Sequence, residues 1–258
     1  MRGRVWQPGI EILFEDDDLI AVVKPAGLPT ANVPADRPSL FTWLGDRFGP
    51  GAFVGIVSRL DAAVSGVVVA AKTPASAAGL AEQFRERTVT KQYAAVVTGR
   101  FPAALGEWRE WTDRLARGAD RQPSEILVAG PPTPGRRQGR GAGGPPGQAG
   151  QPEEQVQEAT TRARVVHRAG EVSLVELQPL TGRRHQLRAQ LAGRGCPIVG
   201  DRLYGSRLPF PLPGGIALHA VGLSLVHPAT GAGLSFATPR GAGWEAAFPS
   251  LFPGKPAR

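Results

Sequence analysis

An unbroken run of small and apolar residues, SGVVVAAK at positions 65–72, limits the fold of this chain more than any other feature. A strand with one face in water alternates polar and apolar side chains, whereas this run offers no polar face. It is therefore predicted to be a strand in the interior of a sheet. Further strands are expected as a short pair within 10–27, interrupted by three aspartates, and at 88–99, 171–179 and 216–228.

Two helices are expected among these strands. Residues 73–87 begin with Thr73, a good helix cap, and Pro74, which suits the first helical position. Residues 182–195 place Leu187 and Leu191 on one helical face and end at a glycine. The order has no regular βαβ rhythm, so we expect an α+β fold. It would be one domain over residues 10–250, built around a largely antiparallel mixed sheet with flanking helices.

One segment does not fit this domain. Of the 24 residues from 129 to 152, 14 are glycine or proline and none is aromatic. Such a composition cannot bury enough apolar surface to offset its ordering entropy, so the segment is interpreted as a mobile insertion. A formal G-x-G-x-x-G occurs at 139–144, but no strand is expected before it and no helix after it. A dinucleotide site is therefore not favoured.

Composition restricts the classes of function. The chain has 30 Lys+Arg against 22 Asp+Glu and a formal charge of +8, which is compatible with a polyanionic partner. Cys196 is the only cysteine and the four histidines are far apart, so no metal site is expected. No stretch resembles a signal peptide or approaches the roughly 20 apolar residues that span a bilayer. We expect a cytoplasmic protein, monomeric and without a membrane partner.

Asp61 is the carboxylate that raises a question of function, because it lies just before the buried strand in VSRLDAAVSG at 57–66. It could simply close a turn. It could also take part in catalysis. Its apolar neighbours would desolvate the carboxylate unless a cation pairs with it, so such a cation is expected nearby. If a strand begins at Ser58, Arg59 lies on the same side as Asp61.

The segment 182–195 contains three candidates for this cation, Arg183, Arg184 and Arg188. In a helix, Arg184 and Arg188 share a face, where two like charges call for anionic partners. A glycosidase needs two carboxyl groups, and the Asp61 segment supplies one. Neither a G-x-S-x-G elbow nor a Walker A loop occurs. A lone aspartate among arginines favours chemistry on a nucleic acid over a structural turn.

Five segments in order then resemble the RluA-type pseudouridine synthases. SRLDAAVSG at 58–66 is similar to the family signature H-R-L-D-x-x-T-S-G, and the others follow the family order. They are DDDLIAVVKPAGLPT (16–30), KQYAAVVTG (91–99), LTGRRHQLRAQLAGRGCPIVGDRLYG (180–205) and LHAVGLSLVHP (218–228). The resemblance covers roughly residues 10–240 and implies the catalytic domain of that family, without the S4-type RNA-binding domain that often precedes it.

The resemblance also implies roles for single residues. Asp61 would be the catalytic aspartate acting at the sugar of the target uridine, Tyr93 would pack on the flipped base, and Arg188 would pair with Asp61. The uracil would be detached from its sugar, rotated and rejoined through carbon, which requires no cofactor. The partner would be structured RNA, ribosomal or transfer. Residues expected to contact RNA or substrate are Arg59, Leu187, Arg183, Arg184, His185 and Gln186.

Some positions depart from the family pattern. Ser58 and Val64 replace a histidine and a threonine around the aspartate, Arg184 replaces a threonine and Gln190 a histidine. These changes leave the three catalytic positions intact but bear on substrate choice. The alternative function is an RNA-binding or RNA-folding protein that has lost turnover. Three further residues are expected to have structural roles: Asp201 and Tyr204 in a turn, and His219 in the core.

Overall fold

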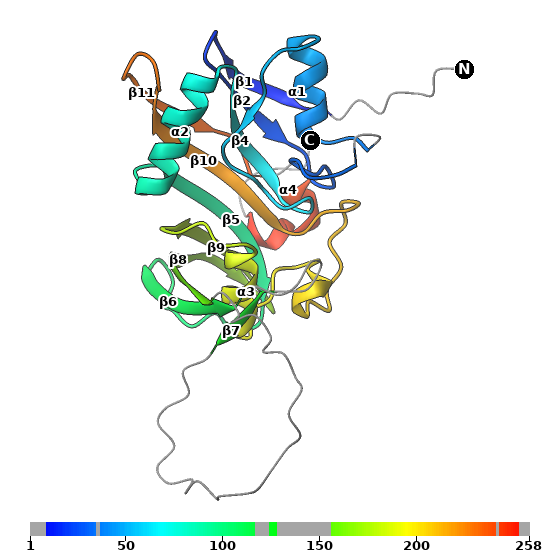
Figure 1. Ribbon diagram of the computed structural model, residues 1–258. Helices are drawn as coiled ribbons and strands as arrows, with labels where there is room; N and C mark the ends of the chain where they lie inside the picture. Colours follow the sequence, from blue (N-terminus) through cyan, green and yellow to red (C-terminus); the bar gives the residue numbers. More distant parts are fainter. Residues whose placement is uncertain (1–8, 35–36, 117–123, 128–155, 241–242, 253–258) are drawn as a thin grey trace, which may run out of the picture.

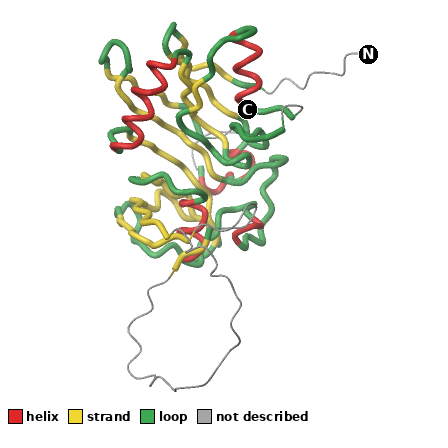
Figure 2. The backbone as a smooth tube through the Cα atoms, viewed as in Figure 1, coloured by secondary structure: helices red, strands yellow, loops and turns green. Residues whose placement is uncertain are grey.

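One large sheet forms the body of the molecule (Figures 1 and 2). The computed structural model describes residues 9–34, 37–116, 124–127, 156–240 and 243–252. Within them, the strands follow the order β1-β2-β4-β10-β5-β9-β8-β6-β7, with β3 paired to β4 and β11 to β10. Every pairing is antiparallel except that of β10 with β4, which confirms the largely antiparallel mixed sheet. The strands are β1 Glu11–Glu15, β2 Leu19–Lys24, β3 Gly55–Ile56, β4 Ser65–Ala71, β5 Thr90–Thr98, β6 Arg109–Ala116, β7 Glu125–Leu127, β8 Val156–Ala169, β9 Val172–Pro179, β10 Leu218–Val226 and β11 Gly233–Ala237.

The predicted interior strand is β4, and helices cover both of its faces. Val67 and Val69 pack with Leu80 of α2 (Pro74–Glu86). Val68 and Ala70 pack on the other face with residues of α1 (Leu40–Phe48). Since neither face meets water, the strand can be apolar throughout. Figure 1 shows α1 and α2 beside the β1-β2-β4 end of the sheet.

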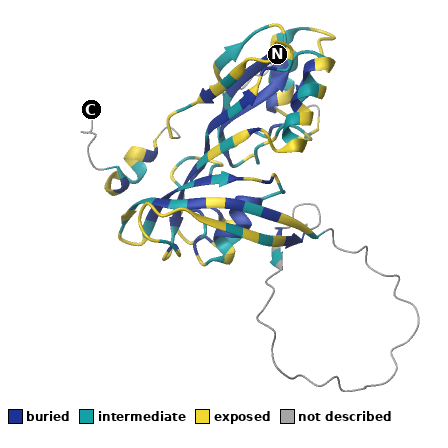
Figure 3. Ribbon diagram, turned by 90° about the vertical axis from the view of Figure 1, so that its left-hand side faces the viewer, coloured by how far each residue is buried: buried dark blue, intermediate teal, exposed yellow. Residues whose placement is uncertain are grey.

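The other end of the sheet carries α3 (Gln186–Gly193), which packs beside β7 and β8. A third apolar core joins β5, β8 and β9 to α3 and to α4 (Trp244–Ala247). Figure 3 shows buried residues along the middle strands and exposed ones toward the edges. Two short 3-10 helices, η1 (Arg202–Tyr204) and η2 (Pro249–Leu251), complete the set.

Glycine is required where β4 begins. Gly66 has φ +123°, and a Cβ there would come within 2.3 Å of the Ala220 carbonyl oxygen on β10. Ala220 is its partner in the parallel pairing of these strands. A side chain at position 66 would therefore force β4 and β10 apart, directly behind the Asp61 segment.

Most predicted elements are confirmed, with two corrections. The helix expected at 182–195 begins only at Gln186, because His185 adopts a left-handed conformation with φ 54°. Arg183 and Arg184 therefore precede the helix, and the inference that Arg184 shares a helical face with Arg188 is wrong. No strand begins at Ser58, since residues 58–64 are an irregular segment and turn. The elements α1, β3, β6, β7, β8, β11 and α4 were not predicted.

The segment 129–152, interpreted as an insertion, lies outside the described residues. Among the described helices, none is long and apolar enough to cross a membrane.

Candidate active site

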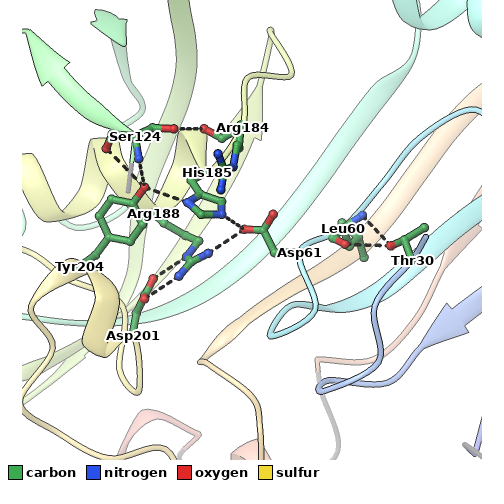
Figure 4. Close-up of polar contacts among 9 residues, drawn as sticks. All are labelled: Thr30, Leu60, Asp61, Ser124, Arg184, His185, Arg188, Asp201 and Tyr204. Atoms are coloured by element: carbon green, nitrogen blue, oxygen red, sulfur yellow. Dashed lines mark hydrogen bonds and ion pairs between the residues drawn. The ribbon is translucent and has the colours of Figure 1, made fainter. Parts of the chain in front are cut away.

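Asp61 begins a tight turn that leads into β4, and its carboxylate points away from that turn toward α3 (Figure 4). Its carbonyl oxygen accepts a hydrogen bond from the Val64 amide at 3.0 Å. Its side chain remains 31% exposed and contacts the guanidinium of Arg188, with Nη1 at 2.9 Å from Oδ2. The backbone of Asp61 thus closes a turn, and its carboxylate has the cation partner that the sequence led us to expect.

Arg188 joins two carboxylates. Besides Asp61, it binds Asp201 through two hydrogen bonds, Nε to Oδ2 at 2.7 Å and Nη2 to Oδ1 at 2.8 Å. The side chains of Arg188 and Asp201 are 8% and 1% exposed. A two-point contact between planar groups fixes orientation as well as distance. Although burial opposes the charge, these two carboxylates raise the pKa of Arg188, so it is a permanent cation facing Asp61.

Tyr204 and His185 form the wall beside this pair. The Tyr204 ring lies under the Arg188 guanidinium at 5.0 Å, and its hydroxyl is 3.0 Å from His185 Nδ1. That hydroxyl also accepts the Ser124 amide at 2.8 Å. His185 Nε2 is 3.6 Å from Asp61 Oδ2. Burial lowers the pKa of His185, Asp61 opposes this, and nearby arginines add to it, so the imidazole is held neutral at pH 7.

Tyr93 approaches Asp61 from β5. Its ring is partly buried against the central core, which also contains Leu187 from α3. Burial and the nearby Asp61 charge both raise the pKa of Tyr93, so the phenol stays protonated. Its hydroxyl makes no hydrogen bond to the described residues, in contrast to Tyr204. The structure thus brings Asp61, Tyr93, Leu187, His185 and Arg188 to one place.

The predicted arginines Arg59, Arg183 and Arg184 differ in their contacts. Arg59 is exposed and has no ion pair within the described part of the chain. Arg183 donates from Nε to the Glu158 carbonyl, and the Arg184 carbonyl accepts from the Ser124 hydroxyl.

Gln186 does not face the site. Its buried side-chain amide makes hydrogen bonds with Thr160, Thr161, Thr181 and the backbone N–H of Arg183. These bonds connect the start of α3 to β8. Gln190 is buried in the same network, bonded to Thr161 and Asp113.

Sequence reasoning missed the roles of Asp201 and Tyr204. Both stand in the GDRLYG stretch, which was read as a turn alone. That expectation was incomplete: Tyr204 does lie in η1 and Asp201 directly precedes it, but the Asp201 carboxylate makes no capping bond and binds Arg188 instead. His219 lies in the core as expected, with its Nδ1 2.7 Å from Ser65 Oγ, but its buried Nε2 makes no hydrogen bond within the described residues.

Lys24, which was not among the predicted site residues, has a buried amino group near the aspartate turn. Its ammonium group donates to the carbonyls of Pro25, Leu28 and Ala62. Burial lowers its pKa to about 7, against the opposing effect of Asp61. The signal in the sequence was a lysine at the end of an otherwise apolar strand.

A groove of about 510 Å³ opens beside Arg188 and Asp201. Its wall is formed by Ala63 of the aspartate turn, Arg202 and Leu203 of η1, and the loop that carries Phe210. Arg202 and Leu203 are exposed. The groove gives the site an open approach next to the Asp61–Arg188 pair.

One group of possible metal ligands occurs among the described residues, away from this site at the β1–β2 turn. It consists of Asp16, Asp18 and His227, with ligand atoms within 4.8 Å of one another. Each side chain already has a protein partner: His227 Nε2 pairs with Asp16, Asp16 also accepts two backbone amides, and Asp18 accepts from Ser76. These contacts indicate that the three side chains stabilise the β1–β2 turn.

Comparison with known proteins gives consistent matches. The family model described as RNA pseudouridylate synthase matches residues 18–193. The dual-specificity RNA pseudouridine synthase RluA of Salmonella typhimurium is 35% identical over 241 residues, covering 90% of this chain and 94% of the relative. Two solved human structures share the fold. RNA Pseudouridylate Synthase Domain Containing 4 has a TM-score of 0.69 at 23% identity and covers 93% of this chain and 92% of its own. RNA Pseudouridylate Synthase Domain Containing 1 has a TM-score of 0.65 at 26% identity and covers 90% and 84%.

Proposed function

The chain belongs to the RNA pseudouridylate synthase family, and on that premise we propose that Asp61, Tyr93 and Arg188 carry out its reaction. The enzyme is an isomerase that converts uridine in RNA to pseudouridine. The observation that carries the proposal is the chain of contacts from Asp61 to Arg188 to the buried Asp201. A protein that only binds RNA has no need of a carboxylate oriented in this way.

The reaction rearranges bonds within one nucleotide. The bond from the sugar to the base nitrogen breaks, the uracil rotates, and a bond from the sugar to ring carbon 5 forms. The hydrogen on carbon 5 is lost to solvent, while the freed nitrogen takes up a proton, so atoms balance without an oxidant or a group donor. Asp61 supplies the negative charge at the sugar, and Arg188 holds its carboxylate in place through a hydrogen bond of 2.9 Å.

Tyr93 supports the base. A partly buried ring on a strand is a rigid surface against which uracil can stack, and such stacking contributes about 1–3 kcal/mol per base. Its raised pKa keeps the hydroxyl protonated, so it can donate a proton or hydrogen bond at neutral pH. Leu187 completes the apolar side of the pocket from α3.

The target uridine must leave its stack to reach this pocket. Extrusion costs a few kcal/mol, which backbone contacts and a replacement in the stack offset. Arg59 is suited to that replacement because it is exposed two residues before Asp61. Arg183 and Arg184 directly precede His185 and α3, so we infer that they contact the RNA backbone and that His185, which lies 3.6 Å from Asp61, faces the target nucleotide.

We propose structured RNA, ribosomal or transfer, as the substrate. The Salmonella relative is named a dual-specificity enzyme, which makes recognition of more than one RNA site a hypothesis for this chain as well. We further propose that residues 10–250 act as one catalytic unit, that segment 129–152 is an insertion in it, and that the enzyme works as a monomer in the cytoplasm, where its RNA substrates are.

Tritium release from RNA labelled at carbon 5 of uridine tests the proposal. The wild-type enzyme should release tritium, whereas Asp61→Asn, which keeps the side-chain volume, should bind RNA and melt normally without release. Release by Asp61→Asn at the wild-type rate would remove Asp61 from the mechanism. Mapping pseudouridine in total RNA from cells with and without the gene would then identify the modified position.

A further inference from the structure

The first turn of α1 fixes the backbone of the preceding segment. The first amides of a helix have no partner within the helix. Here the Leu40 amide donates to the Pro29 carbonyl at 2.8 Å, and the Phe41 amide donates to the Thr30 carbonyl at 2.9 Å. Ser39 caps the next amide, that of Thr42, at 3.1 Å. Thr30 is therefore held by a regular element that packs into its own apolar core.

The Thr30 side chain holds the residue before Asp61. Its hydroxyl donates to the Leu60 carbonyl at 2.8 Å and accepts the Leu60 amide at 3.2 Å (Figure 4). One hydroxyl therefore satisfies both backbone groups of Leu60, and Thr30 itself is only 3% exposed. The Leu60 carbonyl belongs to the peptide bond that leads into Asp61, so its orientation determines where the Asp61 side chain starts.

The residue after Asp61 is held by the same segment. The Ala62 carbonyl accepts from the Gly27 amide at 2.8 Å and from the Lys24 ammonium group at 3.4 Å. The backbone on both sides of Asp61, at Leu60 and at Ala62, is thus held by residues 24–30, whereas the Asp61 carboxylate pairs with His185 and Arg188 at the α3 side.

We propose that Thr30 is a positioning residue for catalysis, which aims the Asp61 carboxylate by clamping the backbone of Leu60. The proposal rests on the proposed function of Asp61. Valine matches threonine in shape but can neither donate nor accept, so Thr30→Val removes both bonds and leaves two Leu60 backbone groups without their partner. A displacement of about 1 Å at a reacting group can lower a rate about a hundredfold.

Four variants test this. Thr30→Val removes the clamp, and Thr30→Ser restores the hydroxyl. Thr98→Val is the matched control, because the Thr98 hydroxyl also bonds a backbone carbonyl, that of Pro197, at the far end of β5. Asp61→Asn reports on the proposed function itself. For each, melting temperature, RNA dissociation constant and the rate of tritium release at saturating RNA are measured.

We expect Thr30→Val to lose about ten- to a hundredfold in rate, with RNA affinity near that of the wild type. Thr30→Ser should recover most of the rate, and Thr98→Val should keep it. A wild-type rate in Thr30→Val, or an equal loss in Thr30→Ser, would overturn the proposal, provided that Asp61→Asn is inactive. Activity in Asp61→Asn would instead refute the proposed function. Should Thr30→Val fail to fold, Thr30→Cys, whose thiol is a weak hydrogen-bonding group, replaces it under the same criteria.

Discussion

Replacing Arg188 by leucine is predicted to destabilise the protein through Asp201 more than through Asp61. The Asp201 carboxylate is 1% exposed and bound at two points, so without Arg188 it is a buried charge without its counter-ion. Breaking such a pair costs about 3–5 kcal/mol. Asp61 is 31% exposed, and water screens its lost contact, so it adds little. For a chain of this size, the loss corresponds to a fall in Tm of about 6–20 °C.

A double variant separates stability from activity. When both partners of a buried pair become apolar, stability is often regained. Arg188→Leu combined with Asp201→Leu should therefore melt well above Arg188→Leu alone. Its rate of tritium release should nevertheless stay near zero, because Asp61 still has no cation beside it.

Arg194→Leu is the matched control. Arg194 caps the end of α3 and binds Asp113 at two points, 2.9 and 3.1 Å, away from Asp61. It should lower Tm but leave the rate at saturating RNA unchanged. Two results would refute the reasoning: a double variant no more stable than Arg188→Leu, or an Arg194→Leu enzyme as slow as Arg188→Leu.

Three further predictions concern single groups. Tyr93→Phe should keep the melting temperature and RNA affinity but lower the rate of tritium release, since its hydroxyl has no structural partner among the described residues; an unchanged rate would limit Tyr93 to stacking. Lys24 has a pKa of about 7 in the folded protein, lowered from the ordinary value of 10.5. Between about pH 7 and 10, Lys24 is therefore protonated in the unfolded chain but largely neutral in the folded one, so the free energy of unfolding rises with pH. Denaturant titrations of Lys24→Met across that window should show a flatter rise, and a slope equal to that of the wild type would contradict the low pKa. Arg59→Ala should weaken RNA binding without changing Tm, and if Arg59 also contacts a phosphate, the slope of log affinity against log salt should flatten by up to about one unit; equal affinity at every salt concentration would exclude Arg59 from the interface.

The strands nearest the site could be predicted because their patterns are local. The apolar run of β4, the aspartates between β1 and β2, and the Thr73–Pro74 start of α2 each identify an element within a few residues. β8 was not predicted because three of the four buried positions in its alternating pattern are Ala159, Thr161 and Ala163, small or polar residues that give no apolar periodicity.

Only the tertiary structure could show where α3 begins. Leu187 and Leu191 have helical spacing, and nothing in GRRH forbids a helix. The left-handed backbone of His185 is stabilised by contacts made elsewhere in the fold, including that of its imidazole with the Tyr204 hydroxyl. Local propensity cannot report such contacts, because they depend on residues that are distant in sequence.

The sequence by itself determined the α+β fold class, the family and the identity of Asp61, Tyr93 and Arg188 as the residues to examine. Only the tertiary structure showed which other residues hold these side chains in position. Asp201, which orients Arg188, lies 13 residues after it in the sequence, and Thr30, which hydrogen-bonds Leu60, lies 30 residues before it. Hydrogen bonds form only when donor and acceptor come within about 3 Å, so the partners are determined by which segments the sheet order brings together. A linear pattern specifies strands and helices, but it does not contain those distances.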